Sequence, residues 1–175
     1  KFDPEKTKWF NQQYLRKKSD KELAAMIRPL IEQKQQELGF RIKDLGVFLD
    51  GFCRLMKEKA HFVNEMWDLG SFFFVAPTSY DADVLKKRLN AQTYAFLVKV
   101  KDDLASLADF TAIETERVFK ASAEAVGIGT GQVMQLFRVA LTGVAGGPSL
   151  FEMMELFGKE ESLERLENAI TAVKV

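Results

Sequence analysis

The sequence predicts a protein built of α-helices, and three observations lead to this fold class. Among the 175 residues, Leu, Ala, Lys, Glu, Phe and Met outnumber Val and Ile, and proline occurs four times. Apolar residues recur every three or four positions, the spacing of the buried face of a helix. In several places Ser or Thr stands three residues before an acid, a pattern that caps a helix start. With 47% hydrophobic residues, the chain can bury a sizeable core.

The helices follow from these signals in chain order. The first is expected at 4–17 and the second at 20–38, directly after the cap of the pair Ser19 and Glu22. Pro29 should kink or break the second helix, because proline lacks a backbone donor and clashes with the preceding turn. The other helices are expected at 41–59, 62–74, 81–89, 91–108, 112–126, 131–142, 150–157 and 160–173.

Two further capping pairs support helix starts in the second half of the chain. They are Thr111 with Glu114 and Ser149 with Glu152. In such a pair the hydroxyl accepts a hydrogen bond from the backbone of the acid, and the acid reaches back to the capping residue. Each pair marks the start of one of the predicted helices.

The organisation of the chain predicts two helical domains. Residues 75–79 have the composition of a loop, and the next helix is expected to begin at Asp81. We place the domain boundary near Asn90, which gives a first helical domain over 1–89 and a second over 90–175.

Cys53 and His61 are the single cysteine and the single histidine of the chain, which limits its chemistry. They allow no internal disulfide and cannot supply the roughly four ligands of a structural zinc, so we expect no metal site. Cys53 lies on an apolar helical stripe and is expected in the core, and His61 at the surface or in a groove. The stretch 127–131 lacks the Lys-Ser/Thr of a phosphate-binding loop. No nucleophile has a recognisable base, so no catalytic residue is predicted.

Nothing in the sequence predicts a membrane segment or a secretion signal. No apolar run approaches the roughly 18 residues that a membrane span needs. The sequence begins at Lys1 with no initiator Met and without the pattern of a signal peptide. We therefore expect an internal fragment of a longer cytoplasmic protein with no membrane partner.

The net charge of zero hides an asymmetry along the chain. Residues 1–60 carry 14 Lys and Arg against 9 Asp and Glu, whereas residues 101–175 carry 7 against 12. The N-terminal third is therefore the better candidate for a surface that faces phosphates. Runs such as Arg16-Lys17-Lys18 are also typical of solvated helix ends, so both interpretations stay open.

A glycine-rich stretch, 143–147, joins two of the predicted helices. Glycines lack side-chain bulk, and Pro148 stiffens the entry to the next helix, whose free backbone N–H groups attract anions or carbonyl oxygens. Arg138 lies one turn before the stretch and can add a planar fork of donors. Leu150 and Phe151 offer an apolar surface on which an unstacked base could lie. A tight interhelical turn packed on core residues is the alternative interpretation.

Three segments in this part of the chain carry a specific pattern. They are Leu136-Phe-Arg-Val-Ala-Leu-Thr-Gly143, Gly147-Pro-Ser-Leu-Phe-Glu152 and Leu156-Phe-Gly-Lys-Glu160. Together they resemble the C-terminal signature of bacterial glutamate–tRNA ligases. Lys8-Trp-Phe-Asn-Gln-Gln-Tyr-Leu15 is similar to the segment with which that family leaves its catalytic core, so the resemblance runs over essentially the whole chain. Neither ATP-site signature of a class I synthetase occurs in it.

The resemblance implies both a fold and a ligand. It implies a two-part helical cage, as in class I aminoacyl-tRNA synthetases, that binds the anticodon loop of tRNA(Glu) as a monomer and has no DNA partner. ATP, Mg²⁺ and the catalytic residues would belong to an N-terminal part outside this sequence. No cofactor is therefore expected in this fragment, which should bind tRNA and catalyse nothing.

The resemblance also assigns roles to residues. The first two anticodon bases would be received by Arg138, Gly147, Pro148, Leu150 and Phe151. Lys59 falls where the family commonly has an arginine that reads the third base, although lysine offers a mobile point charge in place of a bidentate fork. A solvated surface role for Lys59 stays an alternative. Candidate contacts to the tRNA backbone are Arg16, Lys17, Lys18 and Lys21.

A second hypothesis, from a different functional class, is a helical protein-interaction or scaffolding domain. It is favoured by the absence of a net positive charge. The two hypotheses predict different responses to salt, because RNA binding weakens steeply with ionic strength whereas an apolar protein interface does not.

Overall fold

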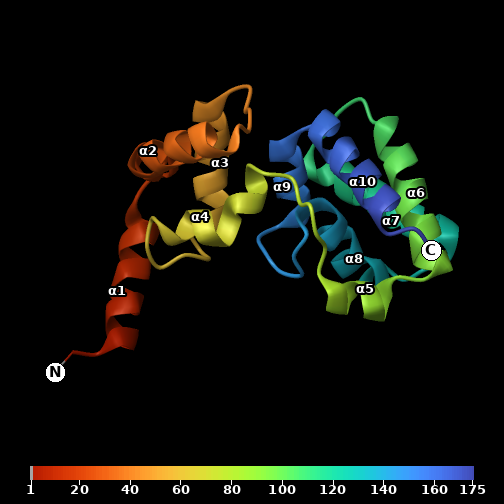
Figure 1. Cartoon of the computed structure of the whole chain (residues 1–175), viewed down its shortest axis with the longest axis horizontal. Helices are drawn as coiled ribbons and strands as arrows, with labels where there is room; N and C mark the ends of the chain where they lie inside the picture. The colour runs from red at the N-terminus through yellow and green to blue at the C-terminus, as the bar shows by residue number, and fades with distance from the viewer. Residues whose placement is uncertain (1) are drawn as a thin grey trace. The chain divides into compact units, whose positions relative to one another are not determined.

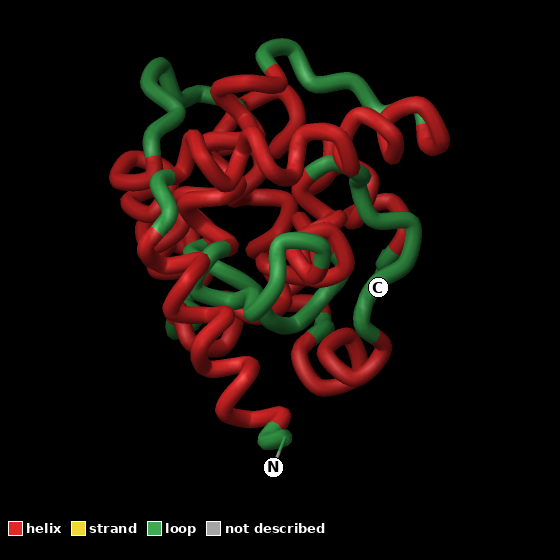
Figure 2. Tube along the Cα trace, turned by 90° about the vertical axis from the view of Figure 1, so that its left-hand side faces the viewer, coloured by secondary structure: helices red, strands yellow, loops and turns green. Residues whose placement is uncertain are grey.

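The computed structural model describes residues 2–175 of the chain. These residues form ten α-helices and one short 3₁₀ helix, with no β-strand among them (Figure 2). The all-α fold class is therefore confirmed. The chain divides into two compact units, unit 1 over Lys1–Val75 and unit 2 over Ala76–Val175. None of the helices in the described range has the length and apolar character that a membrane crossing requires.

Unit 1 contains the first four α-helices and the 3₁₀ helix. They are α1 (Pro4–Lys17), α2 (Asp20–Leu38), α3 (Leu45–Met56), α4 (Glu65–Gly70) and η1 (Ser71–Phe73). Helices α2 and α3 pack against each other, and their fully buried side chains include Leu23, Ile27, Leu49 and Phe52. Figure 1 shows α1 running away from them. The one buried residue of α1 is Leu15. Most of α1 is therefore left outside the core of unit 1.

Aromatic rings fill the rest of the core of unit 1. The ring of Phe74 packs against Phe40, Phe48, Phe52 and Trp67, with ring centroids 4.9 to 5.6 Å apart. At Gly70 an added Cβ would lie 2.7 Å from a ring carbon of Phe52, so the absence of a side chain permits close packing there. The ring contacts of Phe74 are tilted or edge-to-face, and aromatic rings prefer such arrangements to a face-to-face sandwich.

Two predictions about single residues of unit 1 can be checked directly. Cys53 is fully buried, as predicted, and this burial raises the pKa of its thiol to about 12. Helix α2 runs through Pro29 without a break. Pro29 lies on the exposed side of the helix, where water can satisfy the carbonyl group that loses its partner.

Unit 2 contains the remaining six α-helices within the described residues. They are α5 (Ala82–Arg88), α6 (Ala91–Ala105), α7 (Ala112–Val126), α8 (Thr130–Thr142), α9 (Leu150–Phe157) and α10 (Lys159–Ala172). Helix α8 contacts α5, α6, α7 and α10. Its Phe137 packs against Phe96 of α6 and Phe119 of α7, with ring centroids 6.1 and 5.1 Å apart. The C-terminal end of α8 therefore has a well-defined place in unit 2.

The helix boundaries differ from the prediction mainly between residues 41 and 74. Helix α3 begins late, at Leu45, because the side chain of Asp44 caps it by accepting the N–H of Val47 at 3.1 Å. It ends at Met56, and residues 57–64 form turns in place of the helix ends predicted there. The predicted helices at 4–17 and 20–38 match α1 and α2.

The boundary between the units also differs from the predicted position near Asn90. Helix α5 packs on α8, and the N–H of Asp81 donates to the carbonyl oxygen of Gly143 at 3.0 Å. Helix α5 therefore belongs to unit 2, and the division falls after Val75.

Candidate nucleic-acid interface

The glycine loop, residues 143–149, connects α8 to α9 and is bordered by Arg138. The Arg138 side chain is partly buried, and its Nη1 atom donates a hydrogen bond to the carbonyl oxygen of Pro148 at 2.8 Å. Burial lowers the pKa of Arg138, but an arginine stays charged throughout the physiological pH range. One hydrogen bond from the guanidinium thus stabilises the glycine loop. The other donors of the guanidinium form no hydrogen bond to the described residues.

At Gly143 the start of the glycine loop packs closely against the segment 77–81. Its φ of +83° is left-handed, and an added Cβ would lie 2.8 Å from the Cβ of Pro77 and 2.8 Å from the carbonyl oxygen of Ser79. The carbonyl oxygen of Gly143 accepts the Asp81 N–H described above. Only a residue without a side chain fits this position. This contact was not predicted, because nothing in the sequence identifies segment 77–81 as the partner.

Thr142, the last residue of α8, ties the helix to the glycine loop. Its hydroxyl donates to the carbonyl oxygen of Arg138 at 2.9 Å and lies 3.3 Å from the N–H of Val144, which donates to it. Thr142 is buried, so these bonds are shielded from water. This residue was not predicted from the sequence either.

The side chains of Leu150 and Phe151 lie in the core of unit 2. Leu150 is 3% exposed and Phe151 is 8% exposed, and the Phe151 ring packs on Phe119 with centroids 5.5 Å apart. Both residues begin α9, whose buried face also contains Met153 and Met154. The apolar surface expected for an unstacked base is therefore not offered by these two side chains in this structure.

The glycine loop instead exposes mainly backbone. Gly146, Gly147 and Ser149 are exposed, Pro148 is buried, and Val144 contributes the one exposed large apolar side chain. The Ser149 side chain forms no capping hydrogen bond at the start of α9, in contrast to the prediction. A polar ligand can thus approach backbone N–H and carbonyl groups beside the charged Arg138. A role for Gly147, Pro148, Leu150 or Phe151 in base contact stays a prediction.

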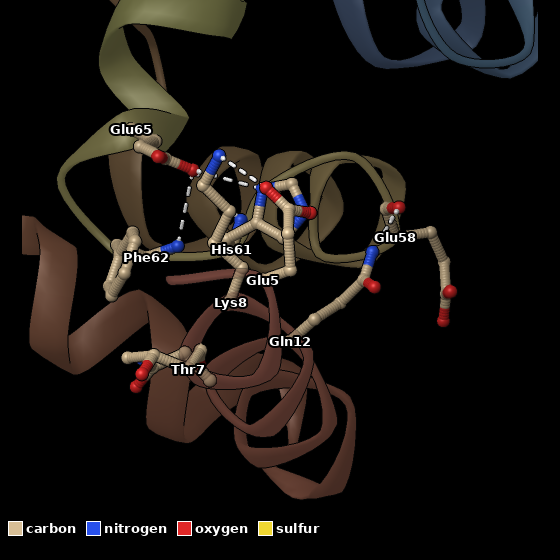
Figure 3. Close-up of polar contacts among 9 residues, drawn as sticks. Glu5, Thr7, Lys8, Gln12, Glu58, His61, Phe62 and Glu65 are labelled. Carbon is tan, nitrogen blue, oxygen red and sulfur yellow. Dashed lines mark hydrogen bonds and ion pairs between the residues drawn. The ribbon is translucent and has the colours of Figure 1, made fainter. Parts of the chain in front are cut away.

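Lys59 lies in unit 1 on an exposed turn between α3 and α4, residues 57–64, which we call the Lys59 turn. Figure 3 shows Glu58, His61 and Phe62 of this turn together with Glu65. The carboxylate of Glu65 accepts the N–H groups of His61 at 2.9 Å and Phe62 at 3.3 Å. On the other side, Glu58 forms an ion pair with Arg16 of α1 at 2.7 Å. Lys59 itself makes no ion pair with the described residues and is free to meet a ligand.

The four candidates for tRNA backbone contact have different surroundings. Arg16 is paired with Glu58, and the ammonium group of Lys18 lies 4.8 Å from the ring centre of Tyr14. Lys17 and Lys21 are exposed and form no ion pair with any described residue. Of the four residues predicted to face phosphates together, two therefore contact other side chains of the protein and two do not.

The described residues hold no group of three or more His, Cys, Asp or Glu side chains that could bind a metal ion. His61 lies 3.6 Å from Glu65 through its Nδ1 atom and is partly exposed, which agrees with the predicted surface position.

Comparisons with known proteins extend over both units. The family model described as "Anticodon binding domain" matches residues 12–170. The glutamate–tRNA ligase of Flavobacterium johnsoniae is 41% identical over 173 residues, which is 99% of this chain and 33% of the relative. The glutamate–tRNA ligase of Parabacteroides distasonis is 37% identical over 174 residues, with the same two shares of 99% and 33%.

A solved structure agrees with these relatives. The crystal structure of a glutamate tRNA ligase from Elizabethkingia meningosepticum, in complex with its amino acid, matches with a TM-score of 0.85 and 35% sequence identity. The match covers 99% of this chain and 33% of that one, so the chain spans only a minor part of the proteins it matches. Because the family model covers residues 12–170, the chain belongs to the anticodon-binding domain family.

Proposed function

We propose that this chain is the part of a glutamate–tRNA ligase that recognises the anticodon loop of tRNA(Glu) in the cytoplasm. The observation that carries the proposal is the braced glycine loop, with Arg138 beside exposed backbone, inside a chain matched by the anticodon-binding model. Single-stranded RNA is read through hydrogen bonds to splayed bases, and an arginine next to an accessible backbone supplies both donors and acceptors for such contacts.

Titration of the chain with tRNA(Glu) and with single anticodon-base variants, each at two salt concentrations, tests this function. We expect binding to weaken as salt rises, because phosphate contacts release counterions. We also expect a wrong base to cost roughly 1–3 kcal/mol where it cannot form a bidentate pair of hydrogen bonds. Equal binding of every anticodon variant would contradict the proposal.

The catalytic step is proposed to belong to the part of the ligase that this chain does not span. The relatives are three times as long as the matched region, which covers 33% of their length. We expect the isolated chain to show no ATP–pyrophosphate exchange with glutamate. Exchange above that of a buffer control would assign a catalytic site to this chain.

A second candidate function is a protein-interaction surface on α1. Trp9, Phe10 and Tyr14 of this helix are 56%, 55% and 51% exposed, which is unusual for large aromatic side chains. A joint change of Trp9 and Phe10 to Ala, assayed with the same tRNA series, separates the two functions. Protein docking through α1 predicts unchanged tRNA binding and salt dependence in this variant.

A further inference from the structure

We propose that the basic end of α5, formed by Lys86, Lys87 and Arg88, contacts the phosphates of the RNA that the glycine loop recognises. None of these residues was predicted as a site residue from the sequence. The inference rests on the proposed function and adds to it a second surface of unit 2.

The three side chains are exposed and lack acidic partners. Lys86, Lys87 and Arg88 are adjacent in sequence, and none forms an ion pair with any of residues 2–175. Asp83 lies one turn earlier on the same helix but does not come within ion-pair distance of them. The basic end of α5 is therefore a local excess of positive charge that is open to solvent.

Most other basic side chains of unit 2 are bonded to an acidic side chain or to a backbone carbonyl group. The pairs are Lys99 with Asp103, Lys101 with Glu167, Arg117 with Glu114, Lys120 with Glu116 and Arg165 with Glu161, at N–O distances of 2.7 to 3.1 Å. Lys159 is bonded to the carbonyl oxygen of Leu107 at 2.8 Å. Unit 2 is the more acidic part of the chain, so three adjacent basic side chains without an acidic partner are an exception there.

Helix α5 is fixed beside the glycine loop. It packs on α8 (Figure 1), with Val84 buried, and its N-terminal neighbour Asp81 donates to the carbonyl oxygen of Gly143 at 3.0 Å. At the other end, the carbonyl oxygen of Arg88 accepts the hydroxyl of Thr93 at 2.7 Å. A helix of seven residues is about 10 Å long, so the basic end lies about one helix length from the end of α5 that contacts the glycine loop.

The position of these cations has a purely structural explanation as well. Basic residues in the last turn of a helix interact favourably with the helix dipole. That explanation predicts a lower melting temperature when the charges are removed, and no change in RNA affinity. Phosphate contact predicts a lower RNA affinity and an unchanged melting temperature, since the side chains project into solvent.

The test uses the whole chain and tRNA(Glu) as the probe. The triple change Lys86→Gln, Lys87→Gln, Arg88→Gln is compared with wild type, and affinities are measured by titration at four or more salt concentrations. The matched control is Arg117→Gln with Lys120→Gln, which removes paired cations from the surface of α7 in the same unit. Melting temperatures of all variants are measured on the same samples.

We expect the triple variant to bind about tenfold to a hundredfold more weakly near 0.1 M salt, equally for matched and mismatched anticodons. The negative slope of log K against log salt should become shallower by about 0.7–0.9 for each phosphate that the variant no longer neutralises. The control should keep the wild-type slope. The variant Lys86→Arg with Lys87→Arg keeps the charge and should keep the slope, which separates an effect of charge from an effect of side-chain shape. The melting temperatures show whether the triple variant is folded.

Three negative outcomes have different meanings. If wild type binds tRNA(Glu) and the folded triple variant binds with the same affinity and slope, the inference is overturned and the proposed function stands. If wild type binds no RNA at any salt concentration, both are overturned. A lower melting temperature with wild-type affinity assigns the three cations to the helix dipole alone and also overturns the inference.

Discussion

The glycine loop of unit 2 and the Lys59 turn of unit 1 were both predicted to meet anticodon bases, yet they are held in different ways. The glycine loop is held by the bond from Arg138 to Pro148 and by Gly143, which has no room for a side chain. The Lys59 turn is held by Glu58 and Glu65, whose side chains are 55% and 37% exposed.

This difference has an energetic consequence. Shielded hydrogen bonds and close packing resist local opening, whereas exposed ion pairs contribute only about 0–1 kcal/mol and are screened by salt. The glycine loop is therefore a preformed frame, and the Lys59 turn can adjust to its ligand. Substitutions in the two segments test that contrast.

The largest effect is expected for Gly143→Ala. The added Cβ meets Pro77 and the carbonyl oxygen of Ser79 at 2.8 Å, and the left-handed backbone adds strain. Together these should lower the free energy of unfolding by about 2–4 kcal/mol, measured by urea denaturation. Gly131→Ala is the matched control in α8, because no heavy atom lies within 4 Å of its added Cβ. Equal stability of both variants would mean that the glycine loop can rearrange to accept a side chain at position 143.

Arg138→Ala should have the next largest effect. Loss of a base contact should cost roughly 1–3 kcal/mol of tRNA binding and reduce discrimination between anticodon variants. Arg138→Lys keeps the charge but not the planar fork, so it should restore affinity more than discrimination. An equal loss for all anticodon variants, with a salt slope smaller by about one unit, would instead identify a phosphate contact.

Lys59 should show a smaller effect that depends on the replacement. Lys59→Ala should weaken tRNA binding by about 1 kcal/mol or less, because an exposed and mobile lysine gains little from one contact. Lys59→Arg should increase discrimination at the third anticodon base by supplying a fork. Both are measured with the tRNA series used for Arg138. If both variants bind all tRNAs as wild type does, Lys59 is a solvated surface residue.

The smallest effect is expected for Glu65→Ala. It removes the acceptor for the N–H groups of His61 and Phe62, which water can replace at this exposed site. The free energy of unfolding should fall by about 1 kcal/mol or less. Third-base discrimination should change, and discrimination of the first two bases should not. A comparable loss at all three bases would show that the two segments are not independent.

The sequence predicted helices best where their ends are marked by local signals. Helix α2 was placed correctly because Ser19 and Glu22 form a capping box and Gly39 ends the helix in a left-handed conformation. The region 57–64 was misassigned. Its Glu58 pairs with Arg16 of the distant helix α1, and local patterns carry no information about such a partner. The bonds from His61 and Phe62 to Glu65 are local, but their pattern was not recognised in the sequence.

The candidate site shows the same limit. Sequence reasoning placed Arg138 beside the glycine loop, since a cluster of glycines beside an arginine is visible in one segment, and the two are in contact in the structure. Their role in base contact stays a prediction. It did not find the contact of Gly143 with residues 77–81, which are more than 60 positions away. It also treated Leu150 and Phe151 as surface, although the inward-facing side of α9 includes both. Burial at the start of a short helix depends on how the helix is docked.

The bond from Arg138 to the carbonyl oxygen of Pro148 also changes the entropy of recognition. A free arginine side chain samples many rotamers, and ordering such a side chain at an interface costs about 0.5–1.5 kcal/mol. Under the proposed function, the protein has already restricted the guanidinium before RNA binds. For a correct base, more of the interaction energy then remains as affinity. For an incorrect base, a restricted guanidinium cannot easily turn to find another acceptor, so the same bond that limits motion also sharpens selectivity.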